Sequence, residues 1–150
     1  MDKNRLNLGC GNNYLDGYTN ADISPEVKPD VVCDITECIP FRDNIFDEVL
    51  CENVLTQILY PETFMQVMND LWRITKPTGE ILIRVPNAEH ICAWQDPFDS
   101  RRFTDQTFTY MQYDHRRYKQ YGLHYGFKPF KVELLENNGI QMRFKLCPIK

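Results

Sequence analysis

The sequence has no long hydrophobic run and no excess of positive charge. No stretch approaches the run of about 18 apolar residues that a membrane-spanning helix needs, and the first residues, MDKNRLNLG, lack the apolar core of a signal peptide. The chain carries 17 Lys and Arg against 21 Asp and Glu, a formal net charge of -4, which does not favour a broad electrostatic grip on nucleic acid. We therefore expect a cytoplasmic protein without a membrane span or a nucleic-acid partner.

Paired metal-binding motifs are also missing. The six cysteines are scattered, with no C-x-x-C pair, and no H-x-x-x-H spacing occurs. Structural zinc sites need such spacings, and scattered cysteines in apolar runs behave as small hydrophobic side chains. We expect reduced thiols and no metal.

The stretch LNLGCGNN, residues 6–13, lacks two features of a dinucleotide site. The third glycine of G-x-G-x-x-G is absent, so the pyrophosphate-binding helix start is not encoded. The segment GCGNNYLDG that follows the first expected strand is shorter than the dozen or so residues that a crossover helix needs. A ligand with a cationic, phosphate-free tail fits better, and S-adenosylmethionine is such a ligand.

The composition that remains is that of one globular domain, residues 1–150. Of its residues, 43% are hydrophobic and 25% are charged, and a chain of 150 residues is long enough for one core. Short apolar runs bounded by polar turns predict buried strands. They lie at 5–8, 18–21, 30–33, 47–51 and 80–85.

One helix and one hairpin complete the prediction. PETFMQVMNDLWRI, 61–74, places Phe64, Val67, Met68, Leu71 and Trp72 on one helical face, and KPTG closes it. Strand, helix, strand in this order builds a parallel sheet, so the class is α/β. The runs 130–136 and 140–146 flank NNG and predict an antiparallel hairpin. Residues 87–103 are expected to form a lid or binding loop, followed by a short helix over 104–111 capped by Thr104.

Candidate binding residues follow the strands, at the edge where open parallel sheets bind ligands. Glycines after the first strand allow close backbone approach to a ligand, and Asp22 after the second can accept both hydroxyl protons of a ribose. Asp34 after the third can accept from the exocyclic amine of adenine, with Ile35, Ile39 or Phe41 beneath the ring. Together these residues indicate an adenosine-type ligand.

At this point the sequence resembles the class I S-adenosylmethionine-dependent methyltransferases, in particular their small bacterial type. The resemblance runs from Leu6 to about Tyr110. It implies an open, mostly parallel, Rossmann-like seven-stranded sheet with an antiparallel terminal hairpin. It also implies roles for individual residues: Cys10 and the glycines lie against the methionine part, and Cys51, Glu52 and Asn53 border the methyl group and the substrate. The motifs that carry it are LNLGCG, GYTNADIS, CIPFRDNIFDEVLCENVL, WRITKPTGEILIRVPN and DPFDSRRFT. The cofactor contacts expected are Asn7, Gly9, Cys10, Gly11, Asp22, Ile23, Asp34, Ile35, Cys51, Glu52 and Asn53.

The chain departs from this family in three places. Asn7 stands where relatives often carry an acidic residue for the ammonium group, and Thr56 and Gln57 replace a Glu-His pair. The helices after the first and second strands are reduced to turns, so one face of the sheet has few helices over it. This thin cover predicts a homo-oligomer or a partner that buries the face.

The acceptor side of the site is less specific. The insertion offers His90, Asp96, Asp99, Arg101 and Arg102, and an arginine fork suits a phosphate or carboxylate, although a solvated charged loop explains them equally well. His115 and His124 are either bases or structural histidines. No catalytic residue is assigned.

Three functions are compatible with these residues. The first is a methyltransferase that acts on a small molecule or on a sugar- or lipid-linked precursor. The second is an S-adenosylmethionine-binding subunit or regulator without its own transferase activity. The third is an enzyme that uses the cofactor differently, for example by cleaving it.

Overall fold

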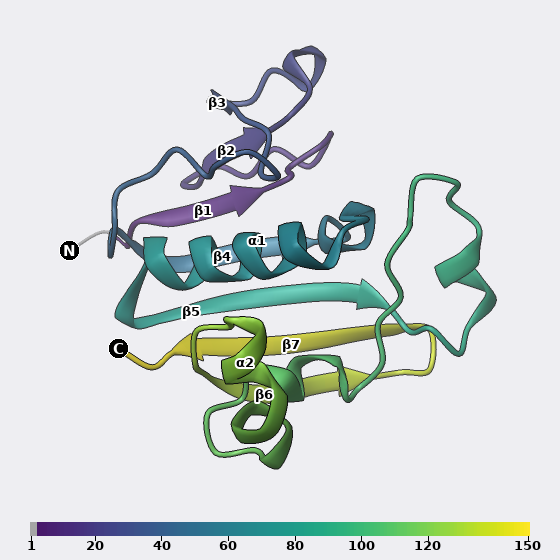
Figure 1. Cartoon of the computed structure of the whole chain (residues 1–150). Helices are drawn as coiled ribbons and strands as arrows, with labels where there is room; N and C mark the ends of the chain where they lie inside the picture. Colours follow the sequence, from purple (N-terminus) through teal and green to yellow (C-terminus); the bar gives the residue numbers. More distant parts are fainter. Residues whose placement is uncertain (1–2) are drawn as a thin grey trace.

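A computed structural model describes residues 3–150 and shows a seven-stranded sheet in the order β3-β2-β1-β4-β5-β7-β6 (Figure 1). Every neighbouring pair is parallel except the two that involve β7, which runs antiparallel to both β5 and β6. The α/β class, the mostly parallel sheet and the antiparallel terminal hairpin are confirmed. The strands are β1 Arg5–Leu8, β2 Thr19–Asp22, β3 Val31–Val32, β4 Phe46–Glu52, β5 Thr75–Pro86, β6 Phe130–Asn137 and β7 Gln141–Pro148.

Helix α1 spans Pro61–Ile74, as predicted, and connects β4 to β5. Its apolar face is buried except at Trp72, which is half-buried and donates its indole N–H to the carbonyls of Pro129 and Ile149. The KPTG segment does not form the predicted closing turn, because the chain enters β5 directly at Thr75. Gly79 permits this: a Cβ there would lie 2.8 Å from the carbonyl oxygen of Phe46.

The other helices are short. The helix predicted over 104–111 is a single 3-10 turn, Thr107–Tyr110, preceded by Thr104, whose hydroxyl accepts from the amide of Gln106 at 3.2 Å. A segment that the sequence did not predict, π-helix Tyr118–Gly122 followed by α2 Leu123–Tyr125, packs on that turn at Gly122, where a Cβ would lie 1.9 Å from the Tyr110 carbonyl oxygen. Three further 3-10 turns are Pro25–Val27, Leu55–Gln57 and Ile91–Trp94. Within residues 3–150, no helix is long and apolar enough to cross a membrane.

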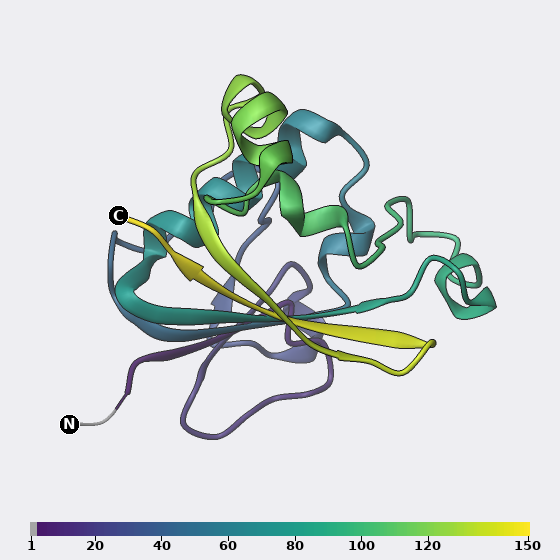
Figure 2. The same cartoon turned by 90° about the horizontal axis from the view of Figure 1, so that it is seen from below.

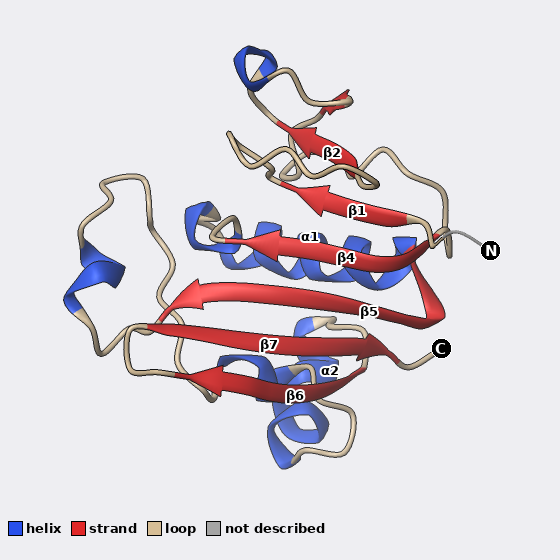
Figure 3. Cartoon of the chain, turned by 180° about the vertical axis from the view of Figure 1, so that it is seen from behind, coloured by secondary structure: helices blue, strands red, loops and turns tan. Residues whose placement is uncertain are grey.

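Helix α1 and the helical segment 107–125 lie on one face of the sheet. Figure 2 shows α1 and the segment 107–125 on the same side, and the loop before β4 joins them there, since Arg73 of α1 donates to the carbonyls of Ile39 and Phe41. From behind, β4, β5, β7 and β6 lie in front of these helices with nothing covering them (Figure 3). The predicted thin cover is thus confirmed.

Cross-strand ion pairs occupy the bare face. Side chains alternate between the two faces of a strand, so Arg84 points away from the buried Ile83 and Val85. Arg84 pairs with Glu52 at 3.2 Å across β5 and β4, and Lys145 pairs with Glu133 at 2.8 Å across β7 and β6. Charged side chains of this kind keep the face hydrated, and the oligomer or partner that would cover it stays a prediction.

A polar network replaces the helix that would follow β1. Asn20 is fully buried; its Nδ2 donates to the carbonyls of Leu15 at 3.0 Å and Tyr18 at 3.1 Å, and its Oδ1 accepts from Asn7 Nδ2 at 2.9 Å. The backbone amide of Asn20 donates to Asp30 Oδ2 at 2.7 Å, and this bond holds the pKa of Asp30 below its usual value. In a helix, backbone carbonyls such as those of Leu15 and Tyr18 would be paired within the helix; here the Asn20 side chain pairs them.

This network leads to a stability prediction. We expect Asn20→Ala to lower the free energy of unfolding by about 2–3 kcal/mol, because it leaves the buried Asn7 amide and several part-buried backbone groups of the 9–18 loop unpaired. Asn12→Ala is the matched control, since Asn12 is exposed in the same loop, and it should change stability by less than about 0.5 kcal/mol. Urea unfolding followed by circular dichroism measures both, and equal losses would contradict the role given to Asn20.

Candidate functional site

A cavity of about 440 Å³ lies at the carboxyl ends of β1, β2 and β4. Its position matches the edge where parallel sheets bind ligands, and its volume falls in the range of small-molecule sites. Seven of the eleven predicted cofactor contacts line it. The lining residues are Leu8, Gly9, Gly11, Ala21, Asp22, Ile23, Cys33, Asp34, Ile35, Thr36, Asn53, Val54, Gln57 and Ile58.

The glycine turn after β1 is held against the end of β2. The amides of Gly9 and Cys10 both donate to the carbonyl of Ala21, at 2.8 and 3.0 Å. Gly9 has φ +67°, and a Cβ on it would lie 2.1 Å from Cγ2 of Val54. Gly11 has φ +49°, with open space where its Cβ would be. The turn therefore needs glycine for packing at Gly9 and leaves free space beside Gly11.

The carboxylate of Asp22 is fixed at the cavity wall. Oδ2 accepts from the Gly11 amide at 2.8 Å and Oδ1 accepts from the Ser24 amide at 2.9 Å. Each carboxylate oxygen has two lone pairs, so both keep accepting capacity after these bonds. An oriented carboxylate of this kind can accept two neighbouring hydroxyl groups.

Asp34 lies at the far end of the same cavity. Its Oδ1 accepts from the amide and the hydroxyl of Thr36 at 2.8 and 2.7 Å, which leaves Oδ2 for another donor. Of the three apolar side chains expected beneath a ring, Ile35 lines the cavity. Ile39 is fully buried, and Phe41 packs edge-to-face on Phe46 at 5.0 Å, so neither contributes to the wall.

The residues that follow β4 form another part of the cavity wall. Asn53 has φ +55°, and its Oδ1 is buried without a hydrogen-bond partner among the described residues. The 3-10 turn after it brings Val54, Gln57 and Ile58 to the cavity. Of these, Gln57 was singled out from the sequence as a departure from the family. Val54 and Ile58 could not be predicted as lining residues from the sequence, because the left-handed backbone of Asn53 sets the direction of the turn that carries them.

Four predicted contacts do not line the cavity. The Asn7 amide is engaged by the Asn13 carbonyl and by Asn20, and Glu52 pairs with Arg84 on the bare face. Cys51 is fully buried, and burial, with the Glu52 charge, raises the pKa of its thiol to about 12. Cys10 is also buried, and burial and the Asp22 charge raise its pKa. Both thiols are therefore neutral at pH 7.

None of the five acceptor-side candidates lines this cavity. His90 Nδ1 accepts from the Cys92 amide at 3.2 Å, and Asp96 Oδ1 accepts from the Phe98 amide at 2.9 Å. Arg102 lies 4.4 Å over the Trp94 ring and donates to the Asp99 carbonyl at 2.6 Å. These four residues build the 87–103 loop itself.

Arg101 is the exception among them, since it reaches a second cavity beside α1. The amides of Ser100 and Arg101 both donate to the Thr56 carbonyl, at 2.9 and 2.8 Å, and so tie the loop to the turn after β4. His115 Nδ1 accepts from the Arg117 amide, and neither His115 nor the exposed His124 lines the first cavity. Across residues 3–150, no group of three or more His, Cys, Asp or Glu is placed to hold a metal ion.

Comparison with known proteins gives a consistent family. The methyltransferase domain family matches residues 6–83. An uncharacterised protein of Methanocaldococcus jannaschii is 33% identical over 78 residues, which are 52% of this chain and 33% of that protein, so the chain spans about a third of its length.

Solved structures share the fold at low identity. A methyltransferase from Clostridium acetobutylicum has a TM-score of 0.68 at 11% identity, over all of this chain and 85% of its own. The DhpI-SAM-HEP complex has a TM-score of 0.68 at 13% identity, over 97% and 78%. A complex of the Haloferax volcanii Trm112 methyltransferase activator with a methyltransferase has a TM-score of 0.64 at 15% identity, over 100% and 84%.

The glycine turn provides the second prediction. Gly9→Ala and Gly11→Ala both place alanine at a positive φ, which costs about 1–2 kcal/mol, but the first also drives a methyl group into Val54. We expect Gly9→Ala to lower the free energy of unfolding by about 1–3 kcal/mol more than Gly11→Ala, and Val54→Ala to recover part of that difference in the double variant. Urea unfolding of the unaltered protein, the two glycine variants and the double variant tests this. An equal loss of unfolding free energy in Gly9→Ala and Gly11→Ala would exclude the clash.

Proposed function

This chain belongs to the class I S-adenosylmethionine-dependent methyltransferases, and from that premise we propose that its first cavity binds S-adenosylmethionine and that it transfers the methyl group to a small molecule or a sugar- or lipid-linked precursor. One observation carries the proposal. Two glycines and two aspartates, which lie at the ends of three different strands, line one cavity of suitable size.

In this proposal the two carboxylates hold the adenosine. Asp22 accepts the ribose hydroxyl groups, because backbone amides already orient both of its oxygens. Asp34 Oδ2 accepts from the adenine amine, with Ile35 against the ring. The DhpI neighbour, solved with the same cofactor, supports this assignment by fold alone.

The other end of the cavity suits the methionine part. Gly11 leaves open space, so the backbone can approach the ligand closely. The buried Oδ1 of Asn53 has no partner within the described chain, and it would accept from a ligand amine, the place that the sequence had suggested for Asn7. The proposed roles of Cys10, Cys51 and Glu52 reduce to shaping the turn and strand that carry these contacts.

The chemistry requires little else from the chain. The cofactor, when bound, supplies a methyl group on a sulfonium, which is already activated for displacement. The protein's residues position the acceptor and exclude water. The cavity wall contains no His or Lys, and the burial of Thr56 keeps its hydroxyl bonded to the Asn53 carbonyl at 3.4 Å. An acceptor that is nucleophilic without a general base fits this wall best.

The same missing base favours a second function. A chain that binds the cofactor but works as a subunit or regulator needs no base, and the Haloferax neighbour was solved together with a methyltransferase activator. A screen of acceptors with S-[methyl-³H]adenosylmethionine separates the two functions. Transfer to any small acceptor, lost in Asp22→Asn, supports the enzyme; cofactor binding without transfer supports the subunit.

Cofactor binding is itself the third prediction. We expect calorimetry to show binding of S-adenosylhomocysteine, and Asp22→Asn to weaken it about tenfold or more, because an amide loses one acceptor and the charge that favours hydroxyl donors. Asp16→Asn is the control, since Asp16 is exposed and lies outside the cavity wall. No binding by the unaltered protein, or equal binding by all three proteins, would exclude this cavity as the cofactor site.

A further inference from the structure

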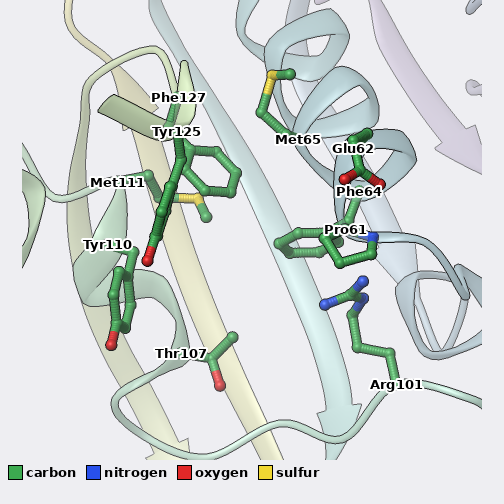
Figure 4. Close-up of a pocket in the computed structure, with 10 residues that line it drawn as sticks. All are labelled: Pro61, Glu62, Phe64, Met65, Arg101, Thr107, Tyr110, Met111, Tyr125 and Phe127. Atoms are coloured by element: carbon green, nitrogen blue, oxygen red, sulfur yellow. The ribbon is translucent and has the colours of Figure 1, made fainter. Parts of the chain in front are cut away.

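A second cavity, of about 490 Å³, lies between the start of α1 and the segment 107–127 (Figure 4). It shares no lining residue with the first cavity. Six of its ten residues are aromatic or methionine. They are Pro61, Glu62, Phe64, Met65, Arg101, Thr107, Tyr110, Met111, Tyr125 and Phe127.

Arg101 is the positively charged side chain among the residues that line this cavity. Its Nε donates to the Ile58 carbonyl at 3.1 Å and its Nη2 to the Leu59 carbonyl at 3.4 Å, while Nη1 makes no hydrogen bond to residues 3–150. Its guanidinium lies 4.3 Å from the Phe64 ring centroid. No carboxylate among those residues lies within 4.0 Å of it, although exposed Glu62 lines the same cavity.

A half-buried cation without a carboxylate is costly, and burial lowers the pKa of Arg101. The two backbone carbonyls supply hydrogen bonds but no negative charge. The remaining N–H groups on Nη1 and Nη2 present the planar fork that matches a carboxylate. The charge of Arg101 is therefore matched once an anion occupies the cavity.

The opposite wall suits a flat ring. In Figure 4, Tyr110, Met111 and Tyr125 lie on the side facing Pro61, Phe64 and Arg101. The rings of Tyr110 and Tyr125 are nearly parallel, with centroids 6.3 Å apart and 21° between their planes. Aromatic and thioether side chains bind flat apolar groups by stacking and by sulfur–ring contacts.

We propose that this cavity binds a small aromatic carboxylate, with its ring between Phe64 and the Tyr110–Tyr125 wall and its carboxylate on Arg101. The site is separate from the cofactor cavity and stands whether or not the chain transfers methyl groups. The two cavities are neighbours, because the Ile58 carbonyl that Arg101 binds belongs to a residue that lines the first.

Calorimetry of the full chain with 2-naphthoate tests the proposal, with 2-naphthamide as the uncharged ligand of nearly the same shape. We expect naphthoate to bind at least about tenfold more tightly than naphthamide, the effect of one charge-assisted hydrogen-bond pair. The titration is repeated with saturating S-adenosylhomocysteine. Unchanged naphthoate affinity supports a separate site, and competition between the two ligands would place naphthoate in the first cavity and overturn the proposal.

Matched variants identify the side chains. Arg101→Gln should remove the preference for naphthoate. Arg102→Gln should keep it, because the guanidinium of Arg102 stacks on Trp94 outside the cavity. Tyr125→Ala should weaken both ligands, because it removes a wall without touching Arg101. Tyr113→Ala is its control, since Tyr113 is 45% exposed, close to the 53% of Tyr125, and lies outside the wall.

The result does not depend on one variant. Arg101 also donates to two carbonyls, so Arg101→Gln could lose its native circular dichroism spectrum. In that case the comparison of naphthoate with naphthamide and the comparison of Tyr125→Ala with Tyr113→Ala test the proposal. Equal binding of the two ligands by the unaltered protein, no binding of naphthoate up to about 10 mM, or Tyr125→Ala that binds as Tyr113→Ala does would each overturn the proposal.

Discussion

The fold depends on the buried side chain of Asn20. Six hydrogen bonds of its side-chain amide and backbone amide tie the loop between β1 and β2, where a covering helix is missing, to Asn7 and Asp30. A backbone turn at a sheet edge must have its polar groups paired, and here a side-chain amide pairs them. Because Gly9 and Cys10 donate to the carbonyl of the next residue, Ala21, the same short segment positions the glycine turn and then Asp22.

Because turns replace the helices after the first strands, helices cover only one face of the sheet. Helix α1 and the 107–125 segment cover one face, and the other face relies on ion pairs such as Glu52–Arg84 and Lys145–Glu133. Exposed pairs of this kind stabilise little, so most of the stability comes from the helical face, where Leu71 and Ile83 are almost completely buried. The first cavity does not need the missing helices, because strand ends and turns form its wall.

Several residues that were expected at the strand ends line one cavity in the structure. Asp22, Asp34 and the two glycines could be named from the sequence because a parallel sheet brings the residues that follow each strand to one edge. Asn7 and Cys51, which the family resemblance implied, do not line the cavity, because they lie within strands, where alternation and neighbouring loops decide what a side chain contacts. The sequence likewise does not predict the directions of Arg101 and Arg102, which are adjacent in the chain but stack on different rings.

The sequence by itself determined the α/β class, the helix over 61–74 and the terminal hairpin, because periodicity and short-range turn chemistry encode them. Its resemblance to a methyltransferase family indicated the cofactor. The tertiary structure alone decided which side chains share a cavity. Asn53 lines the first cavity, with its backbone in a left-handed conformation, and Arg101 lines the second cavity because the carbonyls of Thr56 and Ile58 hold its segment near the start of α1. Contacts such as those of Arg101 join residues that are far apart in the chain, so no local sequence pattern predicts them.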